Sequence, residues 1–139
     1  MSDHIDKIGE WALHYAAQNG DLSEVKALLK KGYPINAFDE IGKTPLHYAA
    51  EEERLEVVKC LLENGAEVNA HDERVIGDTA LKSIAGSCSW EMARLLVEAG
   101  ADPTIPGWMG ITAIDKARDR QRGDGRRIFA LLKKAARQH

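Results

Sequence analysis

The chain has few of the residues that mark secreted or membrane-spanning proteins. Its 139 residues include only two cysteines, Cys60 and Cys88, which are too few for a disulfide framework. No apolar run approaches the roughly 20 residues that a membrane-spanning helix needs. The N-terminal residues Met1-Ser2-Asp3-His4 lack the basic and apolar regions of a signal peptide. We therefore expect no membrane association and a cytoplasmic location, with the nucleus as the alternative.

The sequence also lacks the residue sets that common catalytic and cofactor sites require. It contains no phosphate-binding glycine loop and no cysteine and histidine set with zinc spacing. The stretch around Cys88 is similar to the nucleophile segment of papain-like proteases, but Ser89 separates the cysteine from Trp90, and the C-terminal His139 is the only histidine downstream. We therefore predict that the protein is not an enzyme and has no catalytic, cofactor-binding or metal-binding residues.

What the chain does have is an internal repeat. Residues 11–17 read WALHYAA, and residues 44–50, one step of 33 residues later, read TPLHYAA. Weaker copies begin at Thr79 and Thr112, after steps of 35 and 33 residues. A fixed period in this range predicts a stack of small structural units.

Local signals predict that each unit contains two helices. Thr44 can cap a first helix, with Pro45 at its first position, and Asp21 or Ser23 can cap a second helix. A second apolar segment follows each copy of the motif, and a glycine follows that segment in the first three units, where a chain leaving a helix often needs a positive φ. These glycines are Gly32, Gly65 and Gly100.

These features resemble the ankyrin repeat, whose signature is a unit of about 33 residues with the motif Thr-Pro-Leu-His-x-Ala. Residues 39–69 match best, Trp11 and Ala12 replace Thr and Pro in the first repeat, and Lys82 and Asp115 replace His in the last two. The resemblance implies an all-α solenoid of helix-turn-helix units joined by β-turn-like finger loops. It implies one domain over residues 1–139, with four repeats at approximately 6–38, 39–71, 72–106 and 107–139.

His14 and His47 occupy the same place in two repeats, which suggests a shared metal site. The resemblance implies a structural role instead, because the equivalent histidine of the family makes a hydrogen bond between loop and helix. Stacked repeats also lie about 8–10 Å apart, which is too far for both side chains to bind one ion directly.

Charge is unevenly distributed along the chain. Residues 1–110 carry 10 Lys/Arg against 19 Asp/Glu, a net charge of −9, whereas residues 111–139 carry 9 against 3, a net charge of +6. One interpretation of the basic end is a polar cap that makes the surface of the terminal repeat soluble. The other is a binding site for nucleic acid or another acidic ligand. No aromatic residue that could stack on bases is interleaved with the arginines of this end. We therefore expect a protein partner and keep nucleic acid as the alternative. These arginines are Arg118, Arg120, Arg122, Arg126 and Arg127.

The finger loops share an apolar residue directly before their glycine. In ankyrin repeats the loop tips and the inner face of the first helices usually bind partners, and contiguous apolar surface marks interaction sites. The alternative is that these side chains pack sideways on the neighbouring finger. With their apolar neighbours they form what we call the fingertip strip: Ile8, Phe38, Ile41, Val75, Ile76, Trp108, Met109 and Ile111.

Acidic residues lie near this strip in the second repeat. Glu40 is in the finger, and Glu51 and Glu52 follow the Ala-Ala pair of the first helix. They can attract basic side chains of a partner, although a solvated surface explains them equally well. The sequence therefore predicts a non-enzymatic module that binds another protein as an adaptor, inhibitor or immunity-type blocker. We expect a monomer, with self-association through the fingertips as the alternative.

Overall fold

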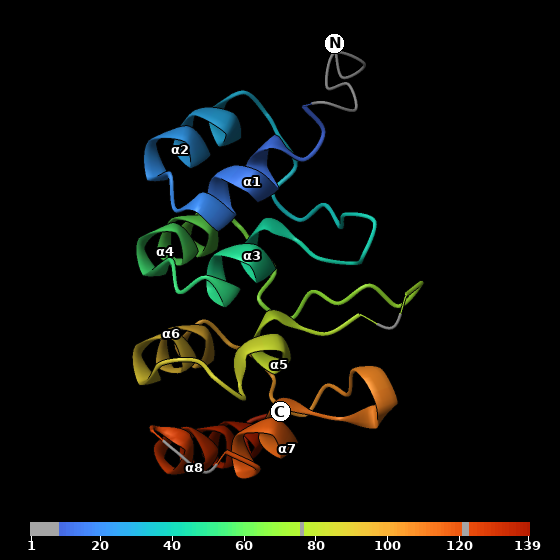
Figure 1. Cartoon of the computed structure of the whole chain (residues 1–139), viewed down its shortest axis with the longest axis vertical. Helices are drawn as coiled ribbons and strands as arrows, with labels where there is room; N and C mark the ends of the chain where they lie inside the picture. Colours follow the sequence, from blue (N-terminus) through green and yellow to red (C-terminus); the bar gives the residue numbers. More distant parts are fainter. Residues whose placement is uncertain (1–8, 76, 121–122) are drawn as a thin grey trace.

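The computed structural model describes residues 9–75, 77–120 and 123–139. Within these residues the chain forms four helix pairs stacked along its long axis, which confirms the predicted all-α solenoid (Figure 1). The pairs are α1 (Ala12–Asn19) with α2 (Leu22–Lys30), α3 (Pro45–Glu51) with α4 (Leu55–Glu63), α5 (Ala80–Ile84) with α6 (Trp90–Glu98), and α7 (Ala113–Arg118) with α8 (Gly125–Ala136).

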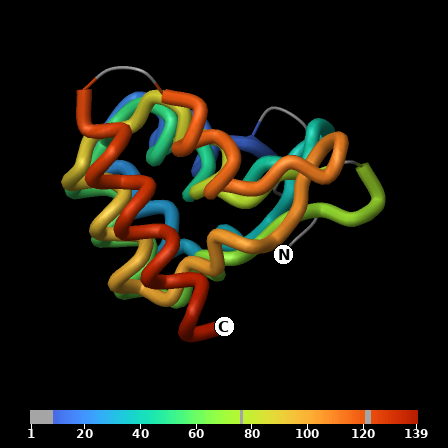
Figure 2. The backbone as a smooth tube through the Cα atoms, turned by 90° about the horizontal axis from the view of Figure 1, so that it is seen from below, coloured from blue at the N-terminus to red at the C-terminus, as the bar shows by residue number. Residues whose placement is uncertain are grey.

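The helices form two layers. The first helix of each pair lies on the inner side, next to the finger loops, and the second helix lies on the outer side (Figure 1). Viewed along the stack, successive repeats lie over one another and the fingers project in the same direction (Figure 2). The fingers and inner helices therefore share one face of the molecule. Among the described residues, no helix combines the length and apolar character needed to cross a membrane.

A continuous apolar core runs through the stack. Leucines at the same position of successive inner helices, Leu13, Leu46 and Leu81, are all fully buried. The buried alanines beside them let neighbouring repeats approach closely, and the outer helices contribute branched side chains such as Val25 and Ile128. Burial of each large side chain contributes about 1.5–3 kcal/mol, so stacking stabilises units that could not bury their apolar face alone.

The helix ends follow most of the predicted capping signals. Thr44 Oγ1 accepts a hydrogen bond from the His47 backbone N–H at 3.4 Å, and Pro45 is the first residue of α3. Asp21 caps α2 by accepting from the Glu24 N–H at 3.1 Å, whereas Ser23 lies within that helix. The predicted positive φ after the outer helices is confirmed at Gly32, Gly65 and Gly100, with values of 93°, 96° and 96°.

The two equivalent histidines link their own inner helices, α1 and α3, to the loop that leads to the next repeat. His14 Nε2 donates to the Ala37 carbonyl at 2.9 Å, and His47 Nε2 donates to the Asp78 carbonyl at 2.6 Å. Both rings are buried, and this burial lowers their pKa values. These hydrogen bonds confirm the structural role that the resemblance implied.

Candidate functional site

Finger 2 (residues 38–43) is held in place by the carboxylate of Asp39. One oxygen accepts hydrogen bonds from the backbone N–H groups of Ile41 at 3.1 Å and Lys43 at 2.9 Å. The other accepts a hydrogen bond from the hydroxyl of Tyr48 on α3. The Asp39 N–H also donates to the Lys43 carbonyl at 2.9 Å, which closes the turn. This network presents Ile41 at the tip of the finger.

The Asp39–Tyr48 contact has a fixed protonation pattern. Burial alone would raise the pKa of Asp39, but the hydrogen bonds from Tyr48 and from the backbone outweigh it and lower that pKa. Burial and the adjacent carboxylate raise the pKa of Tyr48. Asp39 therefore stays ionised and Tyr48 stays protonated at neutral pH, so the finger remains attached to α3.

The fingertip strip is only partly exposed. The exposed fractions are 63% for Ile41, 73% for Met109, 55% for Trp108 and 38% for Val75. Phe38 and Ile111 are half-buried and offer a partner less surface than a loop-tip position suggests. The predicted sites Ile8 and Ile76 lie outside the described residues.

Val75 packs sideways, as the alternative interpretation of the strip proposes. A Cβ atom placed on Gly42 of finger 2 would lie 2.6 Å from Val75 Cγ2, so Val75 covers this glycine of the neighbouring finger. Gly42 has a φ of 79° as well, so both conformation and space favour glycine there. Ile41 and Met109, by contrast, present most of their side chains to solvent.

Finger 4 (residues 107–111) contains the short 3₁₀ turn η2 (Trp108–Gly110). The Gly107 N–H donates to the Ile111 carbonyl at 2.9 Å, and Met109 adopts the left-handed conformation with a φ of 60°. The backbone N–H of Trp108 donates to the carboxylate of Asp78 at 3.2 Å. This contact attaches the last finger to the third repeat.

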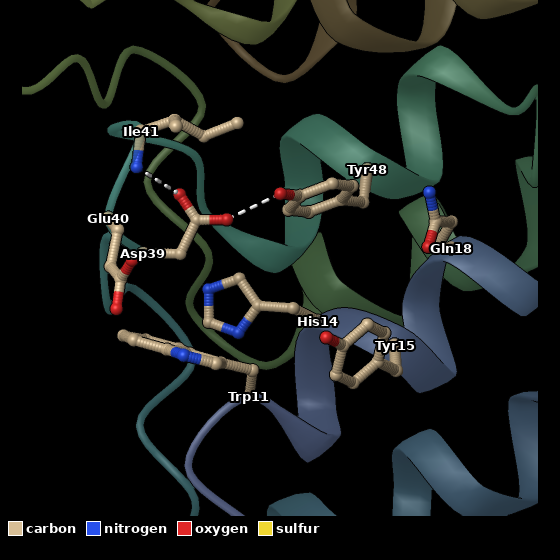
Figure 3. Close-up of a pocket in the computed structure, with 8 residues that line it drawn as sticks. All are labelled: Trp11, His14, Tyr15, Gln18, Asp39, Glu40, Ile41 and Tyr48. Atoms are coloured by element: carbon tan, nitrogen blue, oxygen red, sulfur yellow. Dashed lines mark hydrogen bonds between the residues drawn. The ribbon is translucent and has the colours of Figure 1, made fainter. Parts of the chain in front are cut away.

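Finger 2 and the inner helices α1 and α3 enclose an open groove of ≈ 510 Å³ (Figure 3). Figure 3 shows the rings of Trp11, Tyr15 and Tyr48 around His14. The Trp11 ring lies edge-on to His14 with centroids 5.2 Å apart, and His14 lies edge-on to Tyr48 at 5.9 Å. The groove is lined by Trp11, His14, Tyr15, Gln18, Asp39, Glu40, Ile41 and Tyr48.

The aromatic part of this groove was not among the residues predicted from the sequence. Tyr15, which is 59% exposed, and Tyr48 occupy the variable position of the Thr-Pro-Leu-His-x-Ala motif, where the last two repeats carry Ser83 and Lys116. The signal was therefore an aromatic residue at the inner-helix position of two consecutive repeats. Such residues stack on one side of the solenoid because the period places them on equivalent turns.

The predicted acidic residues differ in availability. Glu40 and Glu52 are exposed, and among the described residues neither side chain has an ion pair. Glu51 is half-buried and accepts from Lys43 Nζ at 2.9 Å, so its carboxylate is already paired within the protein. Lys43 Nζ also lies 5.2 Å from the centroid of the Tyr48 ring.

Several arginines of the basic end have partners within the protein. Arg118 pairs with Asp115 at 2.7 Å, and Arg120 donates to the Cys88 carbonyl at 2.9 Å. The Arg127 guanidinium lies 4.1 Å from the centroid of the Trp90 ring. Arg120 and Arg127 thus attach the fourth repeat to the third, which is a structural use for part of the basic charge. The predicted candidate Arg122 lies outside the described residues.

Cys88 is in the wrong environment for a nucleophile. Burial raises the pKa of its thiol to about 11, and the neighbouring Arg120 only partly opposes this effect. A reactive cysteine needs a lowered pKa and access to solvent, whereas Cys88 is protonated at neutral pH and buried.

Comparison with known proteins agrees with this architecture. A family model described as ankyrin repeats, in three copies, matches residues 2–72, just over half of the chain. A search of curated proteins found no match. The matched residues include the first two helix pairs, the hydrogen bond from His14 to Ala37, and finger 2. The chain therefore belongs to the ankyrin-repeat family.

Proposed function

We propose that this chain is a non-enzymatic module that binds a partner protein through its fingertips and the concave face of its inner helices. Ankyrin repeats generally act as protein–protein interaction modules. The observation that carries the proposal is the exposure of three large apolar side chains on hydrogen-bonded fingers. These are Ile41, Trp108 and Met109.

The conformation of Met109 supports a binding role. A methionine with a positive φ is strained, and with 73% of its surface exposed it contributes little to the protein's own packing. Strain of this kind costs on the order of 1–3 kcal/mol and tends to persist at functional sites. Covering such a side chain with a partner would contribute about 1.5–3 kcal/mol.

The fingers are also organised before a partner arrives. Asp39 anchors finger 2 to α3, and Asp78 anchors finger 4 to the third repeat. Binding would therefore order few additional groups, and more of the contact energy would appear as affinity. Val75, Phe38 and Ile111 would border the contact, and Glu40 and Glu52 would lie at its acidic edge.

A protein of this kind acts by occupying or recruiting its partner. We propose that it works as an adaptor, an inhibitor or an immunity-type blocker, as a monomer in the cytoplasm. The proposed binding residues also include Ile8 and Ile76 of the fingertip strip. They include Glu51 as well, whose carboxylate is paired with Lys43.

The test compares partner capture by the native chain and by the triple variant Ile41→Ser, Trp108→Ser and Met109→Ser. The partner is first identified from native lysate by affinity capture and mass spectrometry, and its Kd is then measured with both proteins. We expect the variant to weaken binding at least about 100-fold, because buried hot-spot side chains each contribute roughly 2 kcal/mol or more. The melting temperature should change by no more than a few degrees.

A matched control uses the outer face. The double variant Lys26→Ser and Lys59→Ser alters a hollow of ≈ 580 Å³ between α2 and α4 and should bind the partner like the native chain. Full binding by the triple fingertip variant would show that the strip is not the binding surface. Full binding together with a large loss of stability would show that the strip serves internal packing.

The alternative function is binding of nucleic acid or another acidic ligand through α8. It depends on exposed basic residues such as Arg126, Lys134 and Arg137. Such a complex should weaken steeply as the salt concentration rises, because phosphate contacts release counterions. It should survive in the fingertip variant, because the substituted residues lie outside α8.

A further inference from the structure

We propose that the groove enclosed by finger 2, α1 and α3 receives an arginine side chain of the partner protein. This inference rests on the proposed function, since it assigns a partner chemistry to one part of the same face. We call this site the aromatic groove and define it by Trp11, Tyr15, Gln18, Glu40, Ile41 and Tyr48 (Figure 3). Its volume of ≈ 510 Å³ lies within the roughly 300–1,000 Å³ of typical ligand pockets.

The walls of the aromatic groove suit a cation. Trp11, Tyr15 and Tyr48 each contribute an aromatic ring, and a cation within about 6 Å of a ring centroid is attracted by the negative ring face. The protein already makes one cation–π contact of this kind beside the groove: Lys43 Nζ lies 5.2 Å from the centroid of the Tyr48 ring. The ring environment therefore accommodates positive charge next to the groove.

The charges around the aromatic groove are predominantly negative. The positive charge of Lys43 is matched by Glu51 at 2.9 Å. Asp39 is ionised, with its oxygens bound to the backbone and Tyr48, and Glu40 is an exposed carboxylate. Within the described part of the chain, the Glu40 side chain has neither a hydrogen bond nor an ion pair. A cationic occupant would therefore compensate charge that the protein leaves uncompensated.

Polar groups without internal partners favour arginine over lysine. Among the described residues, the Tyr15 hydroxyl and the Gln18 side-chain amide also make no hydrogen bond. With the Glu40 carboxylate they offer acceptors on different sides of the aromatic groove. A guanidinium group has five N–H donors in one plane and stacks well on aromatic rings, whereas an ammonium group is more strongly hydrated. An apolar occupant would cover Glu40 without satisfying it, which costs free energy.

The test titrates the full ¹⁵N-labelled chain with three small amides. These are N-acetyl-arginine methylamide, its uncharged analogue N-acetyl-citrulline methylamide, and N-acetyl-lysine methylamide. Binding is followed by the NMR shifts of the Trp11 indole N–H and of the Tyr15 and Ile41 amides. We expect the arginine compound to bind about tenfold more tightly than the citrulline compound, from its cation–π and charge-assisted contacts. The lysine compound should fall between them.

Two variants assign the effect to the aromatic groove. Glu40→Gln should remove most of the preference for arginine over citrulline, whereas Glu63→Gln, which removes an exposed carboxylate at the end of α4, should retain it. Both residues are exposed, so thermal melts should show native stability.

Three results would overturn the proposal: equal affinities for the arginine and citrulline compounds, equal affinities for the arginine and lysine compounds, or shifts confined to residues outside the aromatic groove. Its failure is separable from that of the proposed function. If the amides fail this test while the fingertip variant still loses the partner, only the arginine assignment is wrong. If the preference for arginine is observed while the fingertip variant keeps the partner, the fingertip strip is not the binding surface.

Discussion

Lys82 Nζ donates to the carboxylate of Asp78 at 3.0 Å, from the position where the first two repeats carry His14 and His47. The same carboxylate accepts from the Trp108 N–H at 3.2 Å. In the third repeat the link to the next finger is therefore the hydrogen bond from the Trp108 N–H to a carboxylate that Lys82 holds in place. The first two repeats connect instead through a histidine that donates to a backbone carbonyl. The third repeat has lysine in place of the motif's histidine, and it is still linked to the next repeat, through the carboxylate of Asp78.

We expect Lys82→Met to lower the free energy of unfolding by about 1–3 kcal/mol. Lys82 is only 7% exposed, and its removal would leave Asp78 charged and partly buried without its cation. The decrease should be smaller in the double variant Lys82→Met and Asp78→Asn, because the uncompensated charge is then absent. Urea unfolding of both variants measures the effect, and a loss below about 0.5 kcal/mol in the single variant would contradict it.

Trp11 leaves α1 without the cap that Thr44 provides for α3. His47 Nδ1 accepts from the Thr44 N–H at 3.1 Å, whereas among the described residues His14 Nδ1 has no hydrogen-bond partner. Trp11→Thr should therefore be more stable than Trp11→Ala by about 1 kcal/mol, since both lose the ring and only threonine can cap. Denaturant midpoints of the two variants check this, and equal midpoints would argue against it. Both should bind the arginine amide more weakly than the native chain.

Stability should decrease as the pH falls from 7.5 to 5.5. Burial lowers the pKa of His14 and His47 below the ordinary 6.5, so the unfolded chain binds more protons in this range. The stabilisation is fully present above about pH 7 and is lost as the pH drops through 6.5, at no more than about 1.4 kcal/mol per pH unit for each histidine.

Urea unfolding at several pH values measures this slope. Carboxylates with lowered pKa values, such as Asp39 and Asp115, start from an ordinary 3.8 and lose their contribution only at lower pH. The variant His47→Gln should show a smaller slope than the native chain. A native slope near zero between pH 7.5 and 5.5 would show that the two histidines keep ordinary affinity for protons in the folded state.

Met109→Gly should raise stability and weaken partner binding. Glycine adopts the φ of 60° without the penalty of about 1–2 kcal/mol that a side chain incurs there, and its greater freedom when unfolded offsets about half of this gain. Met109→Ala is the control, since it removes the same contacts and keeps the strained conformation. We expect glycine to melt higher than alanine and both to bind the partner equally weakly. A glycine variant that melts below the alanine variant would refute the strain argument.

The local features of this protein were predictable from its sequence. The period of about 33 residues can be read directly from the copies of the motif. The capping at Thr44 and Asp21 and the glycines after the outer helices each depend on residues within one or two helical turns. Backbone sterics and nearest hydrogen bonds decide such features whatever the rest of the fold.

Only the tertiary structure decided which groups meet across repeats. Tyr15 and Tyr48 line one groove, Val75 covers Gly42, and Arg120 reaches the carbonyl of Cys88, although each pair is about one period apart in the sequence. These contacts depend on the spacing and rotation between stacked repeats, which follow from side-chain packing in the core and are not encoded in any one repeat. The sequence therefore determined the repeating unit and the apolar residues of its fingers. The stack determined the groove between repeats and which of those apolar side chains stay exposed.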